Sequence, residues 1–350
     1  MENLASKYRP RTFSDVVAQK YVKDILVHQL TTNAVKNAYL FCGAAGCGKT
    51  TAARIFANDV NSQKGSPIEL DAASNNGVDD IRDVIEDSKY RSMDSDYKVY
   101  IIDEVHMLST GAFNALLKTL EEPPSGTIFI LCTTDPQKIP ATIMSRVQRY
   151  DFTRLPIESI VDRLKYIISC ENDEIEESAN GEVYQYSEEA LEFIAKLSGG
   201  GMRDAISRLE KVLDYDGSIT IDSVSEALGA PDYQVYLNLL GSIADLAPKE
   251  ALDVVNSIYM SGKDLKIAMR NFTDFVVDVC KFQLVQDLTM TQIPHHLETE
   301  VEELSDALGY DTALWVLEEL NSLNAVIKWE PNPKPIIDLQ MLLMTREAGE

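Results

Sequence analysis

The stretch from Gly43 to Thr50, GAAGCGKT, constrains this chain more than any other part of its sequence. It matches the spacing G-x-x-x-x-G-K-[ST], in which glycines let successive backbone N–H groups point at phosphate oxygens. An apolar run precedes it and a helical pattern follows, so the stretch leads into a helix N-terminus, which attracts anions. Lys49 is placed to reach the terminal phosphates, and the Thr50 hydroxyl to ligate Mg²⁺. The sequence therefore predicts a site for a nucleoside triphosphate.

The first 150 residues alternate between strand and helix patterns, which predicts a parallel sheet covered by helices on both faces. Strands are predicted at 38–42, 67–71, 98–103, 127–133 and 148–152, and helices at 51–60, 78–89, 111–120 and 141–146. After Leu155 the strand signal fades. Helices are predicted there at 156–170, 187–197, 202–213, 221–228, 248–259, 264–286, 297–308, 312–328 and 335–345.

These patterns predict an α/β fold followed by an all-α part, with three domains. The first is an α/β nucleotide-binding domain at 1–154, the second a small helical domain at 155–229, and the third a helical domain at 230–350. The stretch Ala230-Pro231-Asp232 is the predicted boundary between the last two.

The charge of the chain is divided unevenly. Residues 1–150 hold 17 Lys and Arg against 18 Asp and Glu, whereas residues 151–350 hold 15 against 38. The acidity is therefore confined to the C-terminal part, which we interpret as a solvated, helix-rich surface. The nearly neutral N-terminal part remains able to present a local basic surface.

The five cysteines have no C-x-x-C spacing, which predicts buried thiols of a reducing compartment. The N-terminus has no apolar core of signal-peptide length, and no apolar run approaches the ~20 residues of a membrane span. We therefore expect a soluble cytoplasmic protein without a membrane partner.

A second motif supports the nucleotide site. The apolar run Val99–Ile102 ends in Asp103 and Glu104, which predicts a strand that delivers both carboxylates to the sheet edge beside Lys49. Asp103 can hold Mg²⁺ through water, and Glu104 can orient or deprotonate the attacking water. Residues 103–106 also spell D-E-x-H, a helicase pattern, but such a helicase needs a second sheet domain. His106 is therefore predicted to be a helix-start or interface residue.

Two further polar positions follow. Thr133 and Thr134 end the next buried strand, where a hydroxyl can hydrogen-bond the γ-phosphate or the attacking water; a strand-capping role is the alternative. Arg146 follows on a short helix. It is either a surface salt-bridge residue or an arginine finger that reaches a neighbouring subunit.

The order of these motifs resembles the AAA+ clamp-loader ATPases, and in particular the γ/τ subunits of bacterial DNA polymerase III. The resemblance covers residues 7–150 strongly and 151–229 through GMRDA, and it extends to 230–350 only in length and pattern. The runs that carry it are KYRP, VVAQ, DAAS, DEVHML, LLKTLEEPP and TTDPQKIP.

The resemblance implies roles for individual residues. Thr134 is the implied sensor 1, with Thr133 as the alternative. Arg146 is the implied finger acting on a neighbour's ATP, and Arg203 the implied sensor 2 of the same subunit. Arg82 and Lys118 match positions that touch the DNA backbone, although Asn75-Asn76-Gly77 is less basic than the family pattern. The implied nucleotide-binding set is Tyr8, Arg9, Val17, Gly43, Ala45, Gly46, Cys47, Gly48, Lys49, Thr50 and Thr51.

Three departures from the family pattern stand out. Residues 61–66 replace a four-cysteine zinc module, so no zinc is expected there. Ser145-Arg146-Val147 replaces Ser-Arg-Cys. The sequence ends at Glu350, which suggests a short, γ-like form or a phage-encoded or otherwise reduced relative.

The resemblance implies an ATP- and Mg²⁺-dependent motor subunit with a lid domain and an oligomerisation collar. Its implied partners are other γ/τ copies, δ-like and δ′-like subunits, a sliding clamp and primer-template DNA. One alternative is an ATPase-inactive stator subunit, against which Lys49, Thr50, Asp103 and Glu104 argue. Another is a DNA-translocating AAA+ motor, for which a C-terminal winged helix would be expected.

Overall fold

A computed structural model describes residues 3–178, 183–229 and 233–347. The chain divides into two compact units. Unit 1 comprises Met1–Val183 and Ser198–Glu210, and unit 2 comprises Tyr184–Leu197 and Lys211–Glu350. The boundary predicted at 230–232 lies outside the described residues, and the division into three domains stays a prediction. Of the helices described, none combines the length and apolar character that crossing a bilayer requires.

Unit 1 is built on one parallel sheet of five strands in the order β2-β3-β4-β1-β5. The strands are β1 (Ala38–Gly43), β2 (Ile68–Asp71), β3 (Lys98–Asp103), β4 (Thr127–Thr133) and β5 (Gln148–Phe152). They follow the predicted strands within one residue at each end. The α/β fold with a parallel sheet is therefore confirmed.

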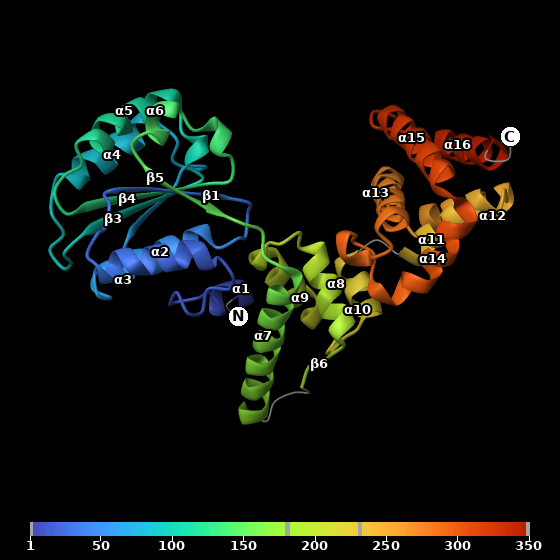
Figure 1. Ribbon diagram of the computed structural model, residues 1–350, viewed down its shortest axis with the longest axis horizontal. Coiled ribbons are helices and arrows are strands. Elements are labelled where there is room, and N and C mark those ends of the chain that lie inside the picture. Colours follow the sequence, from blue (N-terminus) through green and yellow to red (C-terminus); the bar gives the residue numbers. More distant parts are fainter. Residues whose placement is uncertain (1–2, 179–182, 230–232, 348–350) are drawn as a thin grey trace. The chain divides into compact units, whose positions relative to one another are not determined.

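Helices cover both faces of this sheet (Figure 1). On one face lie α2 (Lys20–Thr31) and α3 (Lys49–Val60). On the other lie α4 (Val78–Ser88), α5 (Thr110–Glu121) and α6 (Ala141–Met144). Alternate side chains of each strand enter the two cores: in β1, Tyr39 and Phe41 face α2 and α3, whereas Leu40 and Cys42 face the other layer. Burial on both faces explains why the central strands β1, β3 and β4 are almost continuously apolar.

The remaining elements of unit 1 are short, apart from one long helix. They are α1 (Leu4–Lys7), the 3₁₀ turns η1 (Val105–Met107) and η2 (Pro136–Lys138), α7 (Ile157–Ser178) and the first part of α9 (Met202–Tyr215). Helix α7 runs past its predicted end into the acidic stretch after 170. No helix was predicted for α2, which packs Val22 and Leu26 on the sheet.

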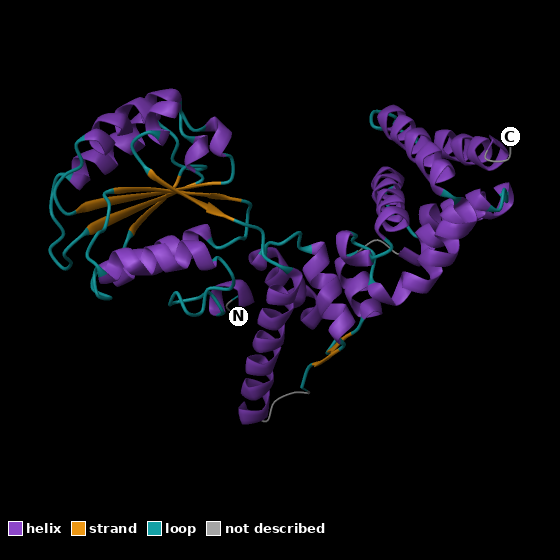
Figure 2. Cartoon of the chain, viewed as in Figure 1, coloured by secondary structure: helices purple, strands orange, loops and turns teal. Residues whose placement is uncertain are grey.

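Unit 2 is almost entirely helical (Figure 2). Besides the rest of α9, its helices are α8 (Glu188–Leu197), α10 (Ile221–Leu228), α11 (Tyr233–Ala244), α12 (Pro248–Met260), α13 (Leu265–Val285), α14 (Glu298–Leu308), α15 (Tyr310–Ile327) and α16 (Lys334–Glu347), with the 3₁₀ turns η3 (Leu288–Met290) and η4 (His295–Leu297). Sequence patterns did not predict helix α11 or the two-residue parallel pair of β6 (Gln185–Tyr186) and β7 (Ser218–Ile219).

The core of unit 2 is aromatic. Tyr236 of α11 lies against Phe272 and Phe275 of α13, with ring centroids 5.8 and 6.1 Å apart. Phe272 and Phe275 are at most 1% exposed. Aromatic pairs of this kind stabilise a core beyond the area they bury. This packing holds α11 as a helix although its aromatic residues and internal Gly241 have modest helix propensity.

Candidate nucleotide site

The loop from Gly43 to Thr50 connects β1 to α3, as predicted, and its glycines are conformationally required. Gly46 and Gly48 have φ of +70° and +102°, a region that side-chain-bearing residues rarely adopt. Gly46 also lies against the start of α9: its carbonyl accepts from Met202 N at 3.0 Å. A Cβ on Gly46 would lie 3.1 Å from Cα of Gly201. Neither glycine can therefore gain a side chain without strain.

Hydrogen bonds to the loop fix the position of the Lys49 side chain. Its Nζ donates to the carbonyls of Gly43 and Ala44 at 2.9 Å each. The side chain is nearly buried, with 6% of the residue exposed. An ammonium carries three donors, so one remains for an anion in the loop. The N-terminus of α3 begins at this residue, and its unpaired N–H groups favour the same anion.

Thr50 and Asp103 meet at the carboxyl edge of the sheet. The Thr50 hydroxyl donates to Asp103 Oδ2 at 2.7 Å, and Asp103 Oδ1 accepts from Glu104 N at 3.0 Å. Mg²⁺ in nucleotide sites usually keeps several waters and takes one or two carboxylates plus phosphate oxygens. A hydroxyl and a carboxylate within hydrogen-bond distance, beside a phosphate-sized loop, fit that requirement.

Glu104 follows β3 in a left-handed conformation with φ 47° and ψ 42°. Its Oε2 accepts from the Thr134 hydroxyl at 2.9 Å and from Thr134 N at 3.3 Å. The same oxygen lies 3.2 Å from Nδ1 of His106. A non-glycine residue in this backbone region costs of order 1–3 kcal/mol and persists only where its surroundings hold it. The contacts with Thr134 and His106 are such surroundings.

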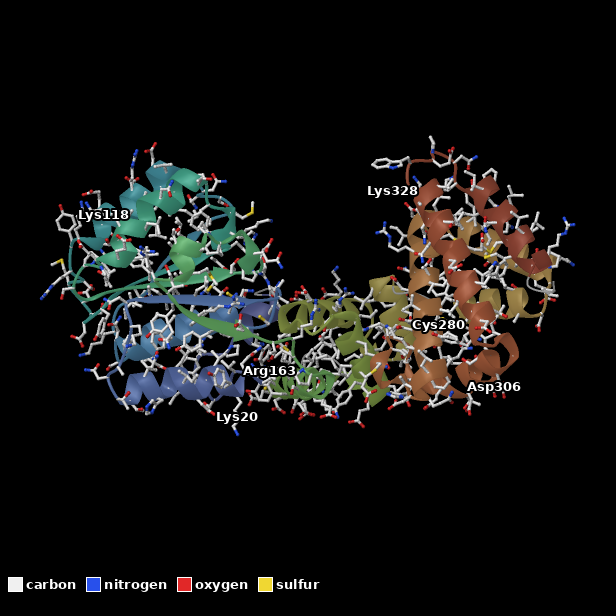
Figure 3. The ribbon with its side chains drawn as sticks, turned by 45° about the horizontal axis from the view of Figure 1, so that its top comes forward. Lys20, Lys118, Arg163, Cys280, Asp306 and Lys328 are labelled. Carbon is white, nitrogen blue, oxygen red and sulfur yellow. The ribbon has the colours of Figure 1, made fainter. Side chains whose placement is uncertain are left out.

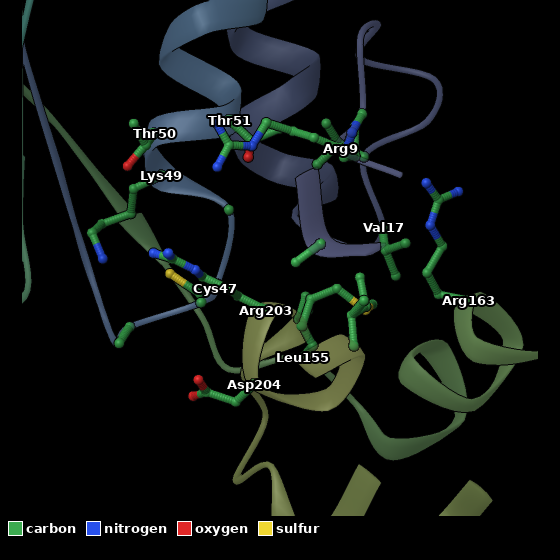
Figure 4. Close-up of a pocket in the computed structure, with 18 of the residues that line it drawn as sticks. Arg9, Val17, Cys47, Lys49, Thr50, Thr51, Leu155, Arg163, Arg203 and Asp204 are labelled. Atoms are coloured by element: carbon green, nitrogen blue, oxygen red, sulfur yellow. The ribbon is translucent and has the colours of Figure 1, made fainter. Parts of the chain in front are cut away.

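A cavity of about 310 Å³ opens beside the loop, within unit 1. Its volume lies at the lower end of the range of small-molecule sites. Several stretches of chain line it: the N-terminal segment, the phosphate loop, the end of β3, the chain around the start of α7, and the start of α9. The lining residues that the sequence predicted are Tyr8, Arg9, Val17, Ala45, Gly46, Cys47, Gly48, Lys49, Thr50, Thr51, Asp103, Glu104 and Arg203. In Figure 4, Arg203 extends from α9 toward the loop that carries Cys47 and Lys49.

The N-terminal segment, which lines this cavity, is hydrogen-bonded to α7. The Tyr8 hydroxyl donates to Glu171 Oε1 at 2.7 Å, and Arg163 donates to the Tyr8 carbonyl at 2.8 Å. Burial and the hydrogen bond to Glu171 raise the pKa of the Tyr8 phenol. Tyr8 therefore remains a hydrogen-bond donor throughout the physiological pH range.

Sequence reasoning did not assign three residues to this site. Arg163 lines the cavity from α7. Gln19 is buried, and its amide donates to the carbonyls of Cys47 at 3.2 Å and Thr153 at 2.7 Å, which ties the phosphate loop to β5. His106 was predicted to be a helix-start or interface residue. It does lie in η1, and it also contacts Glu104. Only the D-E-x-H spacing signalled this contact in the sequence.

The cysteine thiols near the phosphate loop are buried and protonated. Burial raises the pKa of the Cys47 thiol, and the pKa of Cys42 rises to about 11 for the same reason. All five cysteines are free, and Cys170 is the partly exposed one. The thiols near the loop therefore stay protonated and serve as small apolar side chains.

The other predicted residues lie outside the cavity. Gly43 ends β1, and Thr133 is fully buried at the end of β4. Arg146 follows α6 and is exposed. It pairs with Glu121 and also donates to the Thr142 carbonyl at 2.6 Å.

The two predicted DNA-contacting residues lie on α4 and α5. Arg82 of α4 pairs with Asp79 at 2.9 Å, and Lys118 of α5 is exposed. Lys118 and Lys20 lie on opposite sides of unit 1 (Figure 3). Arg82, Lys118 and Arg146 thus share the side formed by α4, α5 and α6.

Comparison with protein families gives two matches. The family described as "DNA polymerase III, delta subunit" matches residues 68–156. The family described as "DNA polymerase III subunits gamma and tau domain III" matches residues 219–317. The first match spans most of the sheet, and the second spans much of unit 2.

Two curated relatives resemble this chain over most of its length. DNA polymerase III subunit tau of Bacillus subtilis is 38% identical over 98% of this chain and 63% of the relative. DNA polymerase III subunit gamma of Buchnera aphidicola is 34% identical over 77% of this chain and 78% of the relative. The chain spans less than two thirds of the length of the first tau subunits that it matches.

A solved structure supports the fold independently. The Thermotoga maritima RuvB Holliday junction branch migration motor superposes with a TM-score of 0.51, covering 74% of this chain and 86% of that structure. The two sequences are 19% identical. This likeness concerns the fold alone.

Proposed function

This chain belongs to the DNA polymerase III gamma and tau subunit family, and from that premise we propose that it is an ATP-driven motor subunit of a sliding-clamp loader. One observation carries the proposal: Lys49, Thr50, Asp103, Glu104 and Arg203 meet in one cavity of a single chain. A stator subunit without ATPase activity would have no need of this complete set. We propose that the subunit works in the cytoplasm as part of a DNA polymerase III-type holoenzyme.

ATP is the proposed ligand of the cavity. The N–H groups at the start of α3 and the remaining donor of Lys49 would receive its phosphates. Arg9 and Val17 supply a cationic and an apolar contact at the opposite end, together with Tyr8, which suits a base and sugar. Thr50 and Asp103 would hold Mg²⁺, which neutralises phosphate charge when bound.

Hydrolysis is proposed to depend on Glu104, Thr134 and Arg203. Glu104 would accept a proton from, or orient, the attacking water at the carboxyl edge of the sheet. Thr134, as sensor 1, would position the γ-phosphate, because its hydroxyl already lies at this edge. Arg203 would stabilise developing negative charge from its own subunit, since its side chain extends toward the loop (Figure 4).

Arg146 is proposed to complete the neighbouring subunit's site rather than its own. Arg146 is not among the described residues that line the cavity. Its pairing with Glu121 is largely exposed, with both side chains about a third to a half accessible. Exposed pairs contribute ~0–1 kcal/mol, so little free energy opposes release of the guanidinium toward a partner.

The remaining parts receive proposed roles from the family. Residues 155–229 would act as a lid and 230–350 as a collar that joins γ/τ, δ-like and δ′-like subunits. Arg82 and Lys118 would contact the phosphates of primer-template DNA while the assembly holds an open clamp. Such contacts attract DNA without reading its sequence.

The test is the ATPase activity of the assembled loader, with and without clamp and primed DNA. We expect hydrolysis to rise only when both are added together, and Lys49→Ala chains to lose ATP binding. An assembly whose hydrolysis is unchanged by clamp and primed DNA would overturn the loader function. An assembly that binds no ATP would favour a stator role.

A further inference from the structure

The start of α9, which carries Arg203, lies directly against the phosphate loop. Met202 N donates to the Gly46 carbonyl at 3.0 Å. Met202 and Arg203 both line the cavity, and Arg203 extends toward the part of the loop that carries Cys47 (Figure 4). The helix that bears the proposed sensor 2 is therefore hydrogen-bonded, backbone to backbone, to the loop that would hold the phosphates.

The residue before α9, Gly201, has no room for a side chain. A Cβ on Gly201 would lie 3.2 Å from the Ala45 carbonyl oxygen and 3.1 Å from Asp204 Oδ2. On the other side of the same contact, a Cβ on Gly46 would lie 3.1 Å from Gly201 Cα. These separations are tighter than ordinary packing contacts, so a side chain at Gly201 would push the helix and the loop apart.

The φ angle of Gly201 does not explain why this residue is glycine. The two preceding residues, Gly199 and Gly200, have φ of +57° and +84°, in the region that favours glycine, whereas Gly201 lies outside that region. An alanine at position 201 would therefore not be strained by its φ angle. The missing side chain serves the close approach of two backbones, which is a recognised use of glycine.

We propose that Gly201 is a positioning residue, which sets how closely Arg203 can approach a bound triphosphate. The inference rests on the proposed ATPase function and deepens it. Arg203 comes two residues after Gly201, in the first turn of a helix whose first N–H is bonded to Gly46. The spacing between helix and loop therefore limits where the guanidinium can reach. A displacement of about 1 Å by a residue outside the chemistry can lower a rate by about 10²-fold.

The first measurement is ATP turnover of the assembled loader with clamp and primed DNA. Gly201→Ala places a methyl group against the Ala45 carbonyl. Gly201→Ser adds the same Cβ together with a hydroxyl, which suits a residue that precedes a helix. We expect both to lower kcat by about 10²-fold, because both carry the Cβ. Gly217→Ala is the matched control and should turn over ATP as wild type does, since a Cβ there would meet no atom within 4 Å.

Wild-type turnover in Gly201→Ala would overturn the proposal. Recovery in Gly201→Ser would assign the loss to helix capping and would overturn it as well, and so would an equal loss in Gly217→Ala. Equal thermal unfolding midpoints in the variants and the wild type would show that folded chains are being compared.

A double-mutant cycle tests whether Gly201 acts through Arg203. Arg203→Ala removes the guanidinium whose position is at issue. Adding Gly201→Ala to that variant should cause no further loss of turnover, because the group that the extra methyl would displace is already gone. Two losses that multiply would show that Gly201 acts on something else, and a purely structural role would give that result.

The last measurement needs neither hydrolysis nor a Gly201 variant. The first N–H groups of a helix lack partners within it, so they normally exchange quickly with solvent. We expect slow exchange for the Met202 amide of the nucleotide-free wild-type chain, measured by NMR after nitrogen-15 labelling of methionine, with Met202→Leu identifying the signal. Rapid exchange would overturn the contact on which the proposal depends, whether or not the variants fold. A loader without ATPase activity would contradict the proposed function, and exchange at Met202 would still decide the contact.

Discussion

In the candidate nucleotide cavity, polar side chains from distant stretches of chain converge. Lys49 is nearly buried, and Lys49, Thr50, Asp103 and Glu104 are all hydrogen-bonded within the chain. Arg146, on the side formed by α4, α5 and α6, is exposed and bonded only to groups near its own surface. Both regions lie in unit 1 and were predicted to serve the same reaction. The difference between them is that one is organised within the chain, whereas the other is proposed to act on a neighbouring subunit.

The two regions differ in the free energy that holds their functional groups in place. The cavity includes one conformation that is costly in isolation, the left-handed backbone of Glu104, and the contacts of Glu104 with its neighbours maintain it. The ion pair of Arg146 with Glu121 contributes little stabilisation, because an exposed ion pair is weak and screened by salt. If Arg146 acts in trans as proposed, each subunit has a preformed site of its own and releases Arg146 to its neighbour at little free-energy cost.

The largest expected effect separates the two regions directly. Arg146→Ala should lower stimulated ATP turnover by about 10³–10⁵-fold, the range for an arginine finger, because developing phosphate charge loses its cation. ATP affinity should remain nearly that of wild type, since Arg146 does not line the cavity. Turnover with clamp and primed DNA, together with equilibrium ATP binding, measures both quantities.

A mixing experiment provides the control. Lys49→Ala chains keep Arg146 but bind no ATP, whereas Arg146→Ala chains bind ATP but supply no finger. Assemblies made from both should regain part of the turnover that each lacks alone. A mixture as inactive as its components would contradict action across the interface.

The next effect tests the cavity alone. Glu104→Gln should lower turnover by about 10²–10⁴-fold, the usual worth of a general base, while ATP binding persists. The amide is nearly the same shape, so the hydrogen bonds from Thr134 can remain. Glu86→Gln makes the same change on the exposed surface of α4 and should leave turnover unchanged. Full activity of Glu104→Gln would remove this residue from the chemistry.

A smaller effect concerns the surface that Arg146 shares with Arg82 and Lys118. Replacing Arg82 and Lys118 with alanine should weaken binding of primed DNA equally for all sequences. The slope of log K against log salt concentration should become shallower by up to ~0.9 for each phosphate contact that is lost. Lys20→Ala, on the opposite side of unit 1, is the matched control (Figure 3). A salt slope that changes only in Lys20→Ala would place the DNA on the other side.

The smallest expected effect lies at the edge of the cavity. Tyr8→Phe deletes the hydrogen bond to Glu171, which Lys7 also contacts at 2.8 Å, so ATP binding should weaken by only about 1 kcal/mol. Tyr21→Phe changes a tyrosine that is 76% exposed on α2 and should have no effect. Calorimetric ATP titrations of both variants measure the difference. An equal loss in the two would show that the Tyr8 bond to Glu171 contributes nothing to binding.

Much of unit 1 could be predicted because its signals are local. Strands buried on both faces are continuously apolar, and the glycines of the phosphate loop occupy backbone regions that other residues avoid. The helices α2 and α11 were not predicted, because β-branched and aromatic residues such as Val22, Tyr233 and Tyr236 weaken their helix propensity. Their helical form depends on packing, of Leu26 on the sheet and of Tyr236 on Phe272.

By itself, the sequence determined the phosphate loop, the carboxylates after β3 and the α/β fold that brings them to one edge, since each follows from residue type and spacing along a short stretch. Only the tertiary structure decided that Gln19 ties the loop to the residue after β5, that Arg163 lines the cavity, and that His106 and Thr134 both lie against the same oxygen of Glu104. These contacts join residues between two and 134 positions apart. The contacts of Glu104 arise because strand ends lie side by side in a parallel sheet, those of Gln19 and Arg163 because helices pack beside it, and no local pattern records which side chains will meet there.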